Sequence, residues 1–473
     1  MRAYLGIDVG TSGLKAVMVG ADGRVLAAGE QQYPVSTPAP GHVEGDADSW
    51  IAAAAAATRQ MSGEPAKATV GAIGISGQMH GATLCDESGR PIGPSILWPD
   101  RRATAVLDRW RSLPGTRLTA LANPLVPGMT GPILAWLGDH RPELVDRAAT
   151  VLHAKDVVRH ALTSHPAEPR PVTDRSDASA TLLWDVPADR WAQDVATAAG
   201  VPLRLLPTAM PSDQEVGRTD WLFRTVSGST ADVAVAAGAA DTAAALLAVG
   251  STGPLINLGT GVQVIIRRPT ASSPDAHLST HLYADASDGW YAMAALQNGG
   301  LALEHAARLL GLSWDGLIAG AARGRSGMVS FLPFFTGERG GVATPSSLGG
   351  WLGAGIDTSR DDLCRAAVEG VMFAIRRGVE LLGPAAAAEP EFTLSGGGWR
   401  SRLLVQLVAD VLDRPVRRIG LRSASAVGAA MLAARCAGAD LVPEGRPDRV
   451  VAPAGSPQLA DAYERWLLRS RSA

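Results

Sequence analysis

Residues 5–20, LGIDVGTSGLKAVMVG, place a turn of glycine, threonine and serine between two apolar runs. The apolar and β-branched residues predict strands over 3–9 and 14–19, and Asp22-Gly23 predicts a further turn into a third strand over 24–30. Backbone N–H groups of a turn with few side chains can surround phosphate oxygens. The hairpin therefore indicates a phosphate cradle, with Asp8 beside it as a ligand for Mg²⁺. A plain tight hairpin capped by Asp8 is the alternative, and this stretch alone does not decide between them.

The same unit recurs about half a chain later, in GPLINLGTGVQVIIRRP (253–269), which again reads as strand, Gly-Thr-Gly and strand. A third glycine cluster, SGGGW (395–399), lies between a predicted strand and a predicted helix. Two similar halves that close on one nucleotide would account for this repeat. We therefore expect an α/β protein with two related domains around a central cleft.

Composition shifts suggest where the domains end. The short polar stretch TVSGST (225–230) predicts a boundary between an N-terminal domain, 1–228, and a C-terminal domain, 229–440. A tail over 441–473 is rich in proline and arginine and contains a predicted helix at 459–470. The stretch 163–174, TSHPAEPRPVTD, is predicted to be a surface loop from its composition.

The bulk composition excludes several classes of function. A net charge of −3 over 473 residues offers no strong field for nucleic acid or an anionic membrane. The run IAAAAAA (51–57) is too short to span a membrane, and Asp8 interrupts the first apolar run too early for a signal peptide. Cys85, Cys364 and Cys436 have no metal-binding spacing and are expected to be free thiols. We therefore expect a cytoplasmic protein with small-molecule partners; a homodimer is left open.

Asp241 lies between small residues, at the start of an alanine-rich predicted helix. In that place we expect an ionised side chain with an ordinary pKa near ~4, able to accept a proton from a substrate hydroxyl. Aspartate is also a favoured N-cap residue, worth about 1 kcal/mol. Both roles can hold together.

Taken in order, the motifs of the chain resemble those of the FGGY-type carbohydrate kinases, and among them most closely the xylulokinases. The motifs are GIDVGTSGLKAV, GISGQMHGATL, ILWPDRR, VPGMTGPILAW, SDASATLLWDV, AAGAADTAA, NLGTGV, FLPFFTGER, LSGGGWRS and AVGAAMLAA. The resemblance covers almost the whole chain. It implies the duplicated fold of actin, hexokinase and Hsp70, which is ribonuclease H-like, with two domains around a cleft. The implied reaction is ATP-dependent phosphorylation of a ketose, with D-xylulose converted to D-xylulose 5-phosphate as the first expectation.

The resemblance also implies roles for particular residues, with ATP and Mg²⁺ as cofactors. Asp241 matches the catalytic base and a sugar contact, and Asp8 matches the metal site. The matches to nucleotide-binding positions are Thr11, Ser12, Lys15, Gly259, Thr260, Gly299, Gly397 and Ser401. The matches to sugar-binding positions are Met79, His80 and Gly128.

The chain departs from the family pattern at Pro99, Ile133, Gly340 and the pair Ala239-Ala240. The first three leave the choice of sugar open, and the alanine pair bears on how Asp241 is presented. Kinases for ribulose, glycerol or another polyol are therefore alternatives. A sugar-binding regulatory relative with weak catalysis is a further one, although the presence of both Asp8 and Asp241 argues against it.

Overall fold

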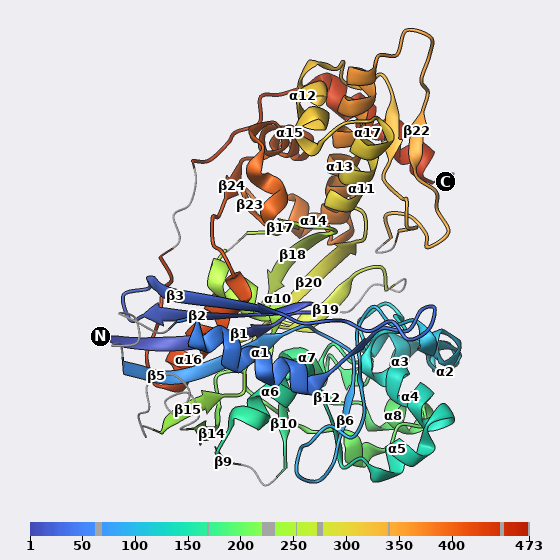
Figure 1. Ribbon diagram of the computed structural model, residues 1–473. Helices are drawn as coiled ribbons and strands as arrows, with labels where there is room; N and C mark the ends of the chain where they lie inside the picture. Colours follow the sequence, from blue (N-terminus) through green and yellow to red (C-terminus); the bar gives the residue numbers. More distant parts are fainter. Residues whose placement is uncertain are drawn as a thin grey trace.

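A computed structural model describes residues 1–61, 69–167, 170–219, 232–251, 253–271, 278–338, 341–444 and 449–471. Figure 1 shows two lobes, each built on its own sheet, with the β1 hairpin in the lower lobe and the β18–β20 strands in the upper one. The domain boundary predicted at 228 lies outside the described residues, as does the departure at Gly340.

The sheet of the lower lobe begins with the predicted hairpins. Its strand order is β3-β2-β1-β5-β15-β14-β9, and β16 also pairs with β5. The neighbours β1, β2 and β3 are antiparallel, whereas β5 and β15 run parallel to β1. These strands are β1 (Arg2–Val9), β2 (Gly13–Gly20), β3 (Val25–Gln32), β5 (Thr69–Gly77), β9 (His165–Pro166), β14 (Glu215–Thr219), β15 (Val233–Ala236) and β16 (Ala239–Ala240). The three strands predicted at the N-terminus are confirmed.

The sheet of the upper lobe repeats this plan. Its order is β19-β20-β18-β17-β23-β24, with β20, β18 and β17 antiparallel and β23 and β24 parallel to β17. The strands are β17 (Leu255–Leu258), β18 (Val262–Arg268), β19 (His281–Ala284), β20 (Trp290–Leu296), β23 (Phe392–Ser395) and β24 (Val416–Arg418). The run β20-β18-β17-β23-β24 thus matches β3-β2-β1-β5-β15 strand for strand. The predicted duplicated ribonuclease H-like fold is confirmed.

Helices and short strands surround the two sheets. The helices are α1 (Ala47–Arg59), α2 (Asp108–Arg111), α3 (Gly115–Ala120), α4 (Thr130–His140), α5 (Pro142–Arg147), α6 (Ala154–Leu162), α7 (Arg175–Ala178), α8 (Gln193–Ala198), α10 (Asp241–Val249), α11 (Gly300–Leu309), α12 (Trp314–Arg323), α13 (Arg360–Leu381), α14 (Pro384–Ala387), α15 (Arg402–Leu412), α16 (Ala424–Cys436) and α17 (Pro457–Ser470). The short strands are β4 (Glu44–Gly45), β6 (Thr83–Cys85), β7 (Ser95–Ile96), β8 (Thr150–Leu152), β10 (Val172–Asp174), β11 (Trp184–Asp185), β12 (Arg190–Trp191), β13 (Thr208–Met210), β21 (Ser330–Leu332) and β22 (Gly350–Leu352).

The helices predicted within the first lobe and at the C-terminal end are confirmed as α1 and α17. In the part of the chain that the structure describes, no helix combines the length and the apolar surface needed to cross a membrane. The prediction of a surface loop over 163–174 is wrong in two places: β9 (His165–Pro166) pairs with β14, and the end of the segment forms β10. There β10 pairs in parallel with β13, and all three of its residues are buried because their polar groups find partners inside the protein.

Helix α16 comes from the second half of the chain, yet it packs against β1 and β5 of the first half. Figure 1 shows it among the strands of the lower lobe. A Cβ atom added to Gly6 of β1 would lie 1.9 Å from the carbonyl oxygen of Ala426, and one added to Gly74 of β5 would lie 2.0 Å from that of Ala429. On the other side of α16, a Cβ on Gly428 would lie 1.8 Å from the carbonyl oxygen of Ala244 in α10. Backbone therefore meets backbone on both faces of this helix.

We expect Gly428→Ala to lower the free energy of unfolding by about 2 kcal/mol or more, because the added methyl meets a main-chain carbonyl that no rotamer change can move. Gly115→Ala is the matched control, since nothing lies within 4 Å of its Cβ position at the start of α3. Urea unfolding of both variants checks the prediction. Equal midpoints for the two would contradict it.

Candidate active site

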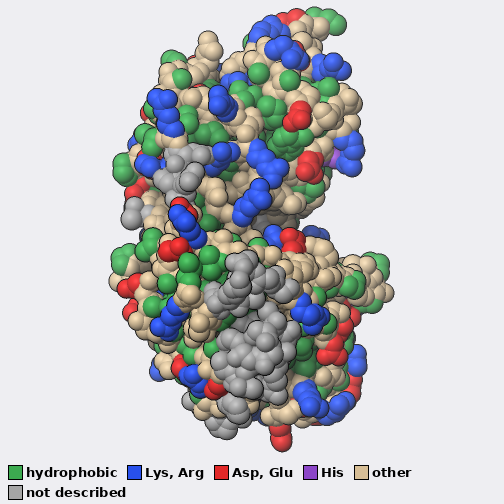
Figure 2. Space-filling view, turned by 60° about the vertical axis from the view of Figure 1, so that its left-hand side comes forward, with side chains coloured by type: hydrophobic (Ala, Val, Ile, Leu, Met, Phe, Trp, Pro, Cys, Tyr) green, Lys and Arg blue, Asp and Glu red, His purple; other side chains and the backbone are tan. Residues whose placement is uncertain are grey.

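A cavity of about 800 Å³ lies between the lobes and is lined by residues of both. The lower lobe contributes Lys15 of β2, and the strands and glycine turn of the upper lobe contribute Asn257, Gln263 and Gly397. Asp241, at the start of α10, also lines it. Figure 2 shows the molecule narrowing between its two lobes. Three of the residues predicted from the sequence, Lys15, Asp241 and Gly397, are thus brought to one cavity.

Asp241 is the first residue of α10, directly after β16. The N-cap is Ala240, so the interpretation of Asp241 as the N-cap residue is wrong. Its Oδ1 accepts hydrogen bonds from the backbone N–H of Thr242 at 2.5 Å and from the hydroxyl of Thr242 at 3.1 Å. The preceding pair Ala239-Ala240 is buried and pairs with β5, and Ala240 has φ −52°. Alanine therefore presents the aspartate without backbone strain.

The side chain of Asp241 does not have the ordinary pKa expected from the sequence. Burial raises its pKa to about 7, and the negative charge of Asp8 adds to the rise, although the hydrogen bonds from Thr242 oppose it. The pKa of Asp8 is itself raised to about 6 by burial, against the opposing effects of the Ser76 hydroxyl and of Lys15. Two half-buried carboxylates therefore share one electrostatic environment at the cleft.

The first hairpin carries the predicted phosphate and metal residues. Asp8 lies opposite Lys15 in the β1–β2 register and accepts a hydrogen bond from the Ser76 hydroxyl at 3.0 Å. Thr11 Oγ1 accepts a hydrogen bond from the indole N–H of Trp98 at 3.0 Å, and Ser12 is exposed. The turn thus remains open to a ligand while its threonine is held by the exposed Trp98.

The second hairpin has a similar glycine–threonine turn that is one residue shorter, since its last paired residues are Leu258 and Val262, against Val9 and Leu14 in the first. Gly259 N–H donates to Gly261 O at 3.0 Å, as Gly10 N–H donates to Gly13 O at 3.0 Å in the first hairpin. Gly259 and Thr260 are exposed, and nothing lies within 4 Å of a Cβ added to Gly259.

The predicted nucleotide residue Gly299 lies against this second turn. Its backbone N–H donates to Thr260 O at 3.1 Å, so that group is already used within the protein. The buried carboxylate of Glu338, which the sequence analysis did not single out, holds the same loop through the N–H groups of Gln297 and Asn298. Gly299 therefore supports the hairpin from behind.

The glycine cluster SGGGW begins a single 3-10 turn, Gly397–Arg400, which is followed by α15. Nothing lies within 4 Å of a Cβ on Gly397, so its backbone faces open space in the cavity. Ser401 is the N-cap residue of α15, and its side chain makes no capping hydrogen bond. It is not among the residues that line the cavity.

The residues predicted to bind sugar lie together at the end of β5. His80 has φ +63°, and its Nδ1 lies 2.7 Å from Ala180 O. Tyr291 donates a hydrogen bond to the sulfur of Met79 at 3.6 Å, and Gly81 N–H donates to Gly128 O at 3.1 Å. The structure therefore brings Met79, His80 and Gly128 into one loop cluster, adjacent to the hairpin of Asp8 through β5.

Two of the residues that depart from the family pattern lie in this lobe. Ile133 is buried in the core of the lower lobe, where an apolar side chain fits. Pro99 is half-buried in the turn before Asp100, whose buried carboxylate accepts hydrogen bonds from Val43 N–H and Arg102. Neither departure disturbs the local structure.

The sequence analysis missed two groups of charged residues around the site. Arg400, Arg418 and Arg422 line the cavity. A buried set of charges centred on Lys155 lies behind the loop of Asp241. The available signal was the pair of aspartates in TDRSD (173–177), three residues apart; Asp174 was instead assigned to the predicted loop over 163–174.

Family models match almost the whole chain. The model for the N-terminal domain of the FGGY family of carbohydrate kinases matches residues 3–248, and that for its C-terminal domain matches residues 255–437. This chain belongs to the FGGY family of carbohydrate kinases. It is therefore a phosphotransferase that uses ATP, as the sequence predicted.

Individual FGGY kinases are similar to this chain over more than nine tenths of its length. The xylulose kinase of Escherichia coli (strain K12) is 32% identical over 444 residues, which cover 92% of this chain and 89% of that protein. A glycerol kinase of Ralstonia nicotianae is 30% identical, with 92% and 89% of the two chains covered. The crystal structure of xylulose kinase from Rhodospirillum rubrum has a TM-score of 0.88 at 27% identity, and the match covers 99% of this chain and 97% of that one.

The raised pKa of Asp241 predicts how stability depends on pH. An aspartate in the unfolded chain has a pKa of about 4, whereas Asp241 in the folded protein has a pKa of about 7. Between these two pH values, the folded protein holds a proton that the unfolded chain has lost. Stability from this group is therefore lost as pH rises through that window. We expect the stability of Asp241→Asn relative to the wild type to increase by about 1 kcal/mol or more between pH 5 and pH 8, because most of the window lies between these values. Urea unfolding at both values measures this, and a difference that does not change with pH would contradict it.

Proposed function

We propose that this FGGY kinase phosphorylates a ketose with ATP, and that D-xylulose is converted to D-xylulose 5-phosphate. The observation that carries the proposal is the position of Asp241, a half-buried carboxylate at the cavity between the lobes, with a pKa raised to about 7. The names of the xylulose kinases of similar sequence support the choice of sugar.

In this proposal Asp241 is the general base. Its carboxylate accepts the proton of the sugar hydroxyl while that oxygen forms a bond to the terminal phosphorus of ATP, and the bond from this phosphorus to ADP breaks. When the pKa of a base is close to the working pH, a large fraction of the molecules have the base ionised and ready to accept a proton. The base is also basic enough to keep the proton it takes from the sugar hydroxyl. The hydrogen bonds from Thr242 keep its Oδ1 in a fixed direction, which favours a productive approach.

The residues present fit ATP and Mg²⁺. Gly397 and Gly259 leave open space where a side chain would stand, and Lys15 and the arginines of the cavity provide positive charge for phosphate oxygens. The charge of Asp8 raises the pKa of Asp241, and the carboxylate of Asp8 uses only Oδ1 for Ser76, so Asp8 would hold the cation. Mg²⁺ bound there would neutralise charge on the transferred phosphoryl group.

Met79, His80 and Gly128 are proposed to bind the sugar. The ring of His80 is half-buried and lies 5.9 Å from that of Tyr283, and its Nδ1 is held by Ala180 O, so the position of this side chain is fixed. Because one of the similar proteins is a glycerol kinase, glycerol is an alternative acceptor of the phosphoryl group. Ribulose is a further alternative. The presence of Asp8 and Asp241 in one electrostatic environment favours an active enzyme over a sugar-binding regulatory protein.

We also propose that the protein acts in the cytoplasm, since all three cysteines are free thiols, with Cys85 and Cys364 buried and Cys436 half-buried. A homodimer stays a prediction, and sedimentation of the purified chain distinguishes it from a monomer.

Coupled detection of ADP with D-xylulose, ribulose, hexuloses and glycerol tests the proposal. We expect the highest kcat/KM for D-xylulose, and Asp241→Asn should lower kcat by about 10²–10⁴-fold, because a general base contributes that much. Binding of ATP to this variant, measured by calorimetry, should change little. A wild type without turnover on any of these sugars would refute the function, and full activity of Asp241→Asn would refute the role of this residue.

Filling the open space at Gly397 should weaken nucleotide binding. We expect Gly397→Val to raise the Kd for ATP about tenfold, which corresponds to about 1.4 kcal/mol, because its side chain would enter the cavity. Gly115→Val is the control, since that position also has open space but does not line the cavity. Calorimetric titration with ATP measures both variants, and equal Kd values would contradict the proposed nucleotide-binding role of Gly397.

A further inference from the structure

A buried group of charged side chains lies in the lower lobe behind the loop that carries Asp241. Helix α6 supplies Lys155, Asp156 and Arg159, and the segment β10–α7 supplies Asp174 and Asp177. None of the five is more than 2% exposed. The ammonium of Lys155 lies 2.6 Å from Asp156 Oδ1, 3.0 Å from Asp174 Oδ1 and 3.2 Å from Asp177 Oδ2. We call these residues the Lys155 cluster.

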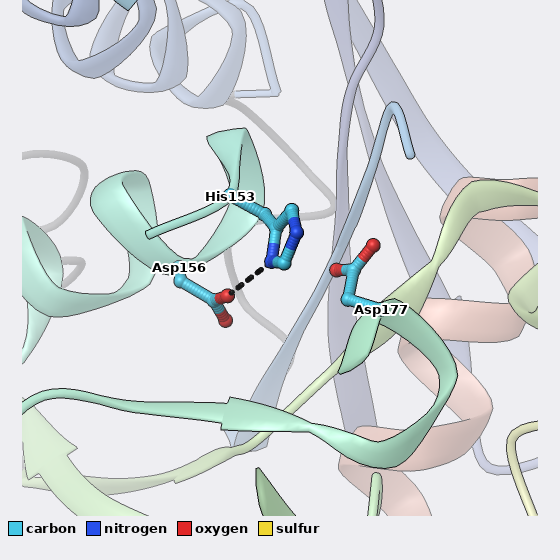
Figure 3. Close-up of side chains that lie close together, drawn as sticks. All are labelled: His153, Asp156 and Asp177. Carbon is cyan, nitrogen blue, oxygen red and sulfur yellow. Dashed lines mark ion pairs between the residues drawn. The ribbon is translucent and has the colours of Figure 1, made fainter. Parts of the chain in front are cut away.

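Part of the cluster has the residue types of a metal site. Figure 3 shows His153, Asp156 and Asp177 facing one another, with an ion pair of 3.5 Å between His153 Nδ1 and Asp156 Oδ2. Positive charge is supplied within the cluster itself, because Lys155 contacts three carboxylates and Arg159 donates to Asp156 at 2.6 Å. The cluster is therefore held by internal ion pairs, for which Lys155 and Arg159 supply the cations.

Ser176 joins this cluster to the loop of the proposed base. Its hydroxyl donates to Asp174 Oδ2 at 2.6 Å and accepts a hydrogen bond from the backbone N–H of Ala240 at 2.8 Å. A hydroxyl has one proton, and an ionised carboxylate can only accept. Asp174 therefore fixes the orientation of the Ser176 hydroxyl, so that a lone pair faces Ala240, the N-cap residue of α10.

The same loop is held at a second point. Arg159 Nη1 donates to the carbonyl oxygen of Ala237 at 2.5 Å, and this guanidinium is itself paired with Asp156. The chain from Ala237 to Ala240 is therefore fixed at one end by Arg159 and at the other by Ser176. Asp241 is the next residue.

We propose that Ser176, oriented by Asp174 and Lys155, is a positioning residue for Asp241. This inference rests on the proposed function, in which Asp241 is the general base. The hydrogen bond from Ala240 fixes the backbone immediately before Asp241, and so the direction from which its carboxylate meets the sugar hydroxyl. Loss of this bond leaves the binding residues in place and misplaces the base.

The chain offers a matched control for the Ser176 hydroxyl. Ser212 is also buried, and its hydroxyl donates to the same carboxylate oxygen, Asp174 Oδ2, at 2.9 Å. The side chain of Ser212 makes no hydrogen bond to Ala240 among the described contacts. Ser176→Ala and Ser212→Ala therefore each remove one donor to Asp174, and only the first removes the acceptor for Ala240.

Steady-state kinetics of the full chain, on whichever sugar the wild type phosphorylates, tests the positioning role. We expect Ser176→Ala to lower kcat about tenfold or more, since small misplacements of a reacting group cost up to about 10²-fold. Its KM for ATP should stay within about twofold of the wild-type value, and Ser212→Ala should keep a kcat within about twofold. Ser176→Thr retains the hydroxyl and should recover most of the lost rate.

Hydrogen exchange provides a readout that does not depend on activity. The segment 237–242 should exchange faster in Ser176→Ala than in Ser212→Ala, because only the first loses the bond to the Ala240 N–H. Equal exchange, or equal kcat for the two variants, overturns the inference. A wild type that phosphorylates no sugar instead refutes the proposed function, and an Asp241→Asn variant with full turnover refutes the role of Asp241 as the base. In both cases the exchange experiment still tests the bond to Ala240.

Discussion

The arrangement of the two halves depends on how closely α16 approaches the first sheet. Gly6 of β1 and Gly74 of β5 present bare backbone to this helix, and Gly428 of α16 presents bare backbone to α10. The Ser76 hydroxyl, in the middle of this contact, lies 3.0 Å from Asp8 Oδ1 and 3.2 Å from Ser425 O. Because these approaches leave no room for a methyl group, they fix the start of α10, and with it Asp241, relative to the hairpin of Asp8.

The pKa values of carboxylates in the lower lobe are shifted in two opposite directions. Burial would raise the pKa of Asp156, but Lys155 and Arg159 outweigh it, and the pKa lies well below its usual range. At the cleft, by contrast, burial raises the pKa of Asp8 to about 6 and that of Asp241 to about 7. Internal cations thus neutralise Asp156, whereas Asp8 and Asp241, like Asp177 of the Lys155 cluster, keep an unmet demand for a proton or a cation.

Local sequence signals predicted the parts whose structure depends on near neighbours. The Asp22-Gly23 turn and the apolar runs around Gly10 sufficed for the first three strands, since turn chemistry and strand alternation act over a few residues. Val172–Asp174 shows the limit of such reasoning. These residues follow a proline-rich polar stretch, yet they form a buried parallel strand because distant residues, Ser212 and Lys155 among them, satisfy the carboxylate of Asp174.

The sequence by itself determined the duplicated plan of strands, the glycine hairpins and the identity of the acid at the start of α10. Those features follow from short-range sterics and from a repeated pattern that can be read along the chain. Only the tertiary structure decided the pKa of Asp241 and the placement of α16 on the first lobe. A pKa depends on burial and on charges such as Asp8, more than two hundred residues away in the chain, and no local pattern encodes a distance of that kind.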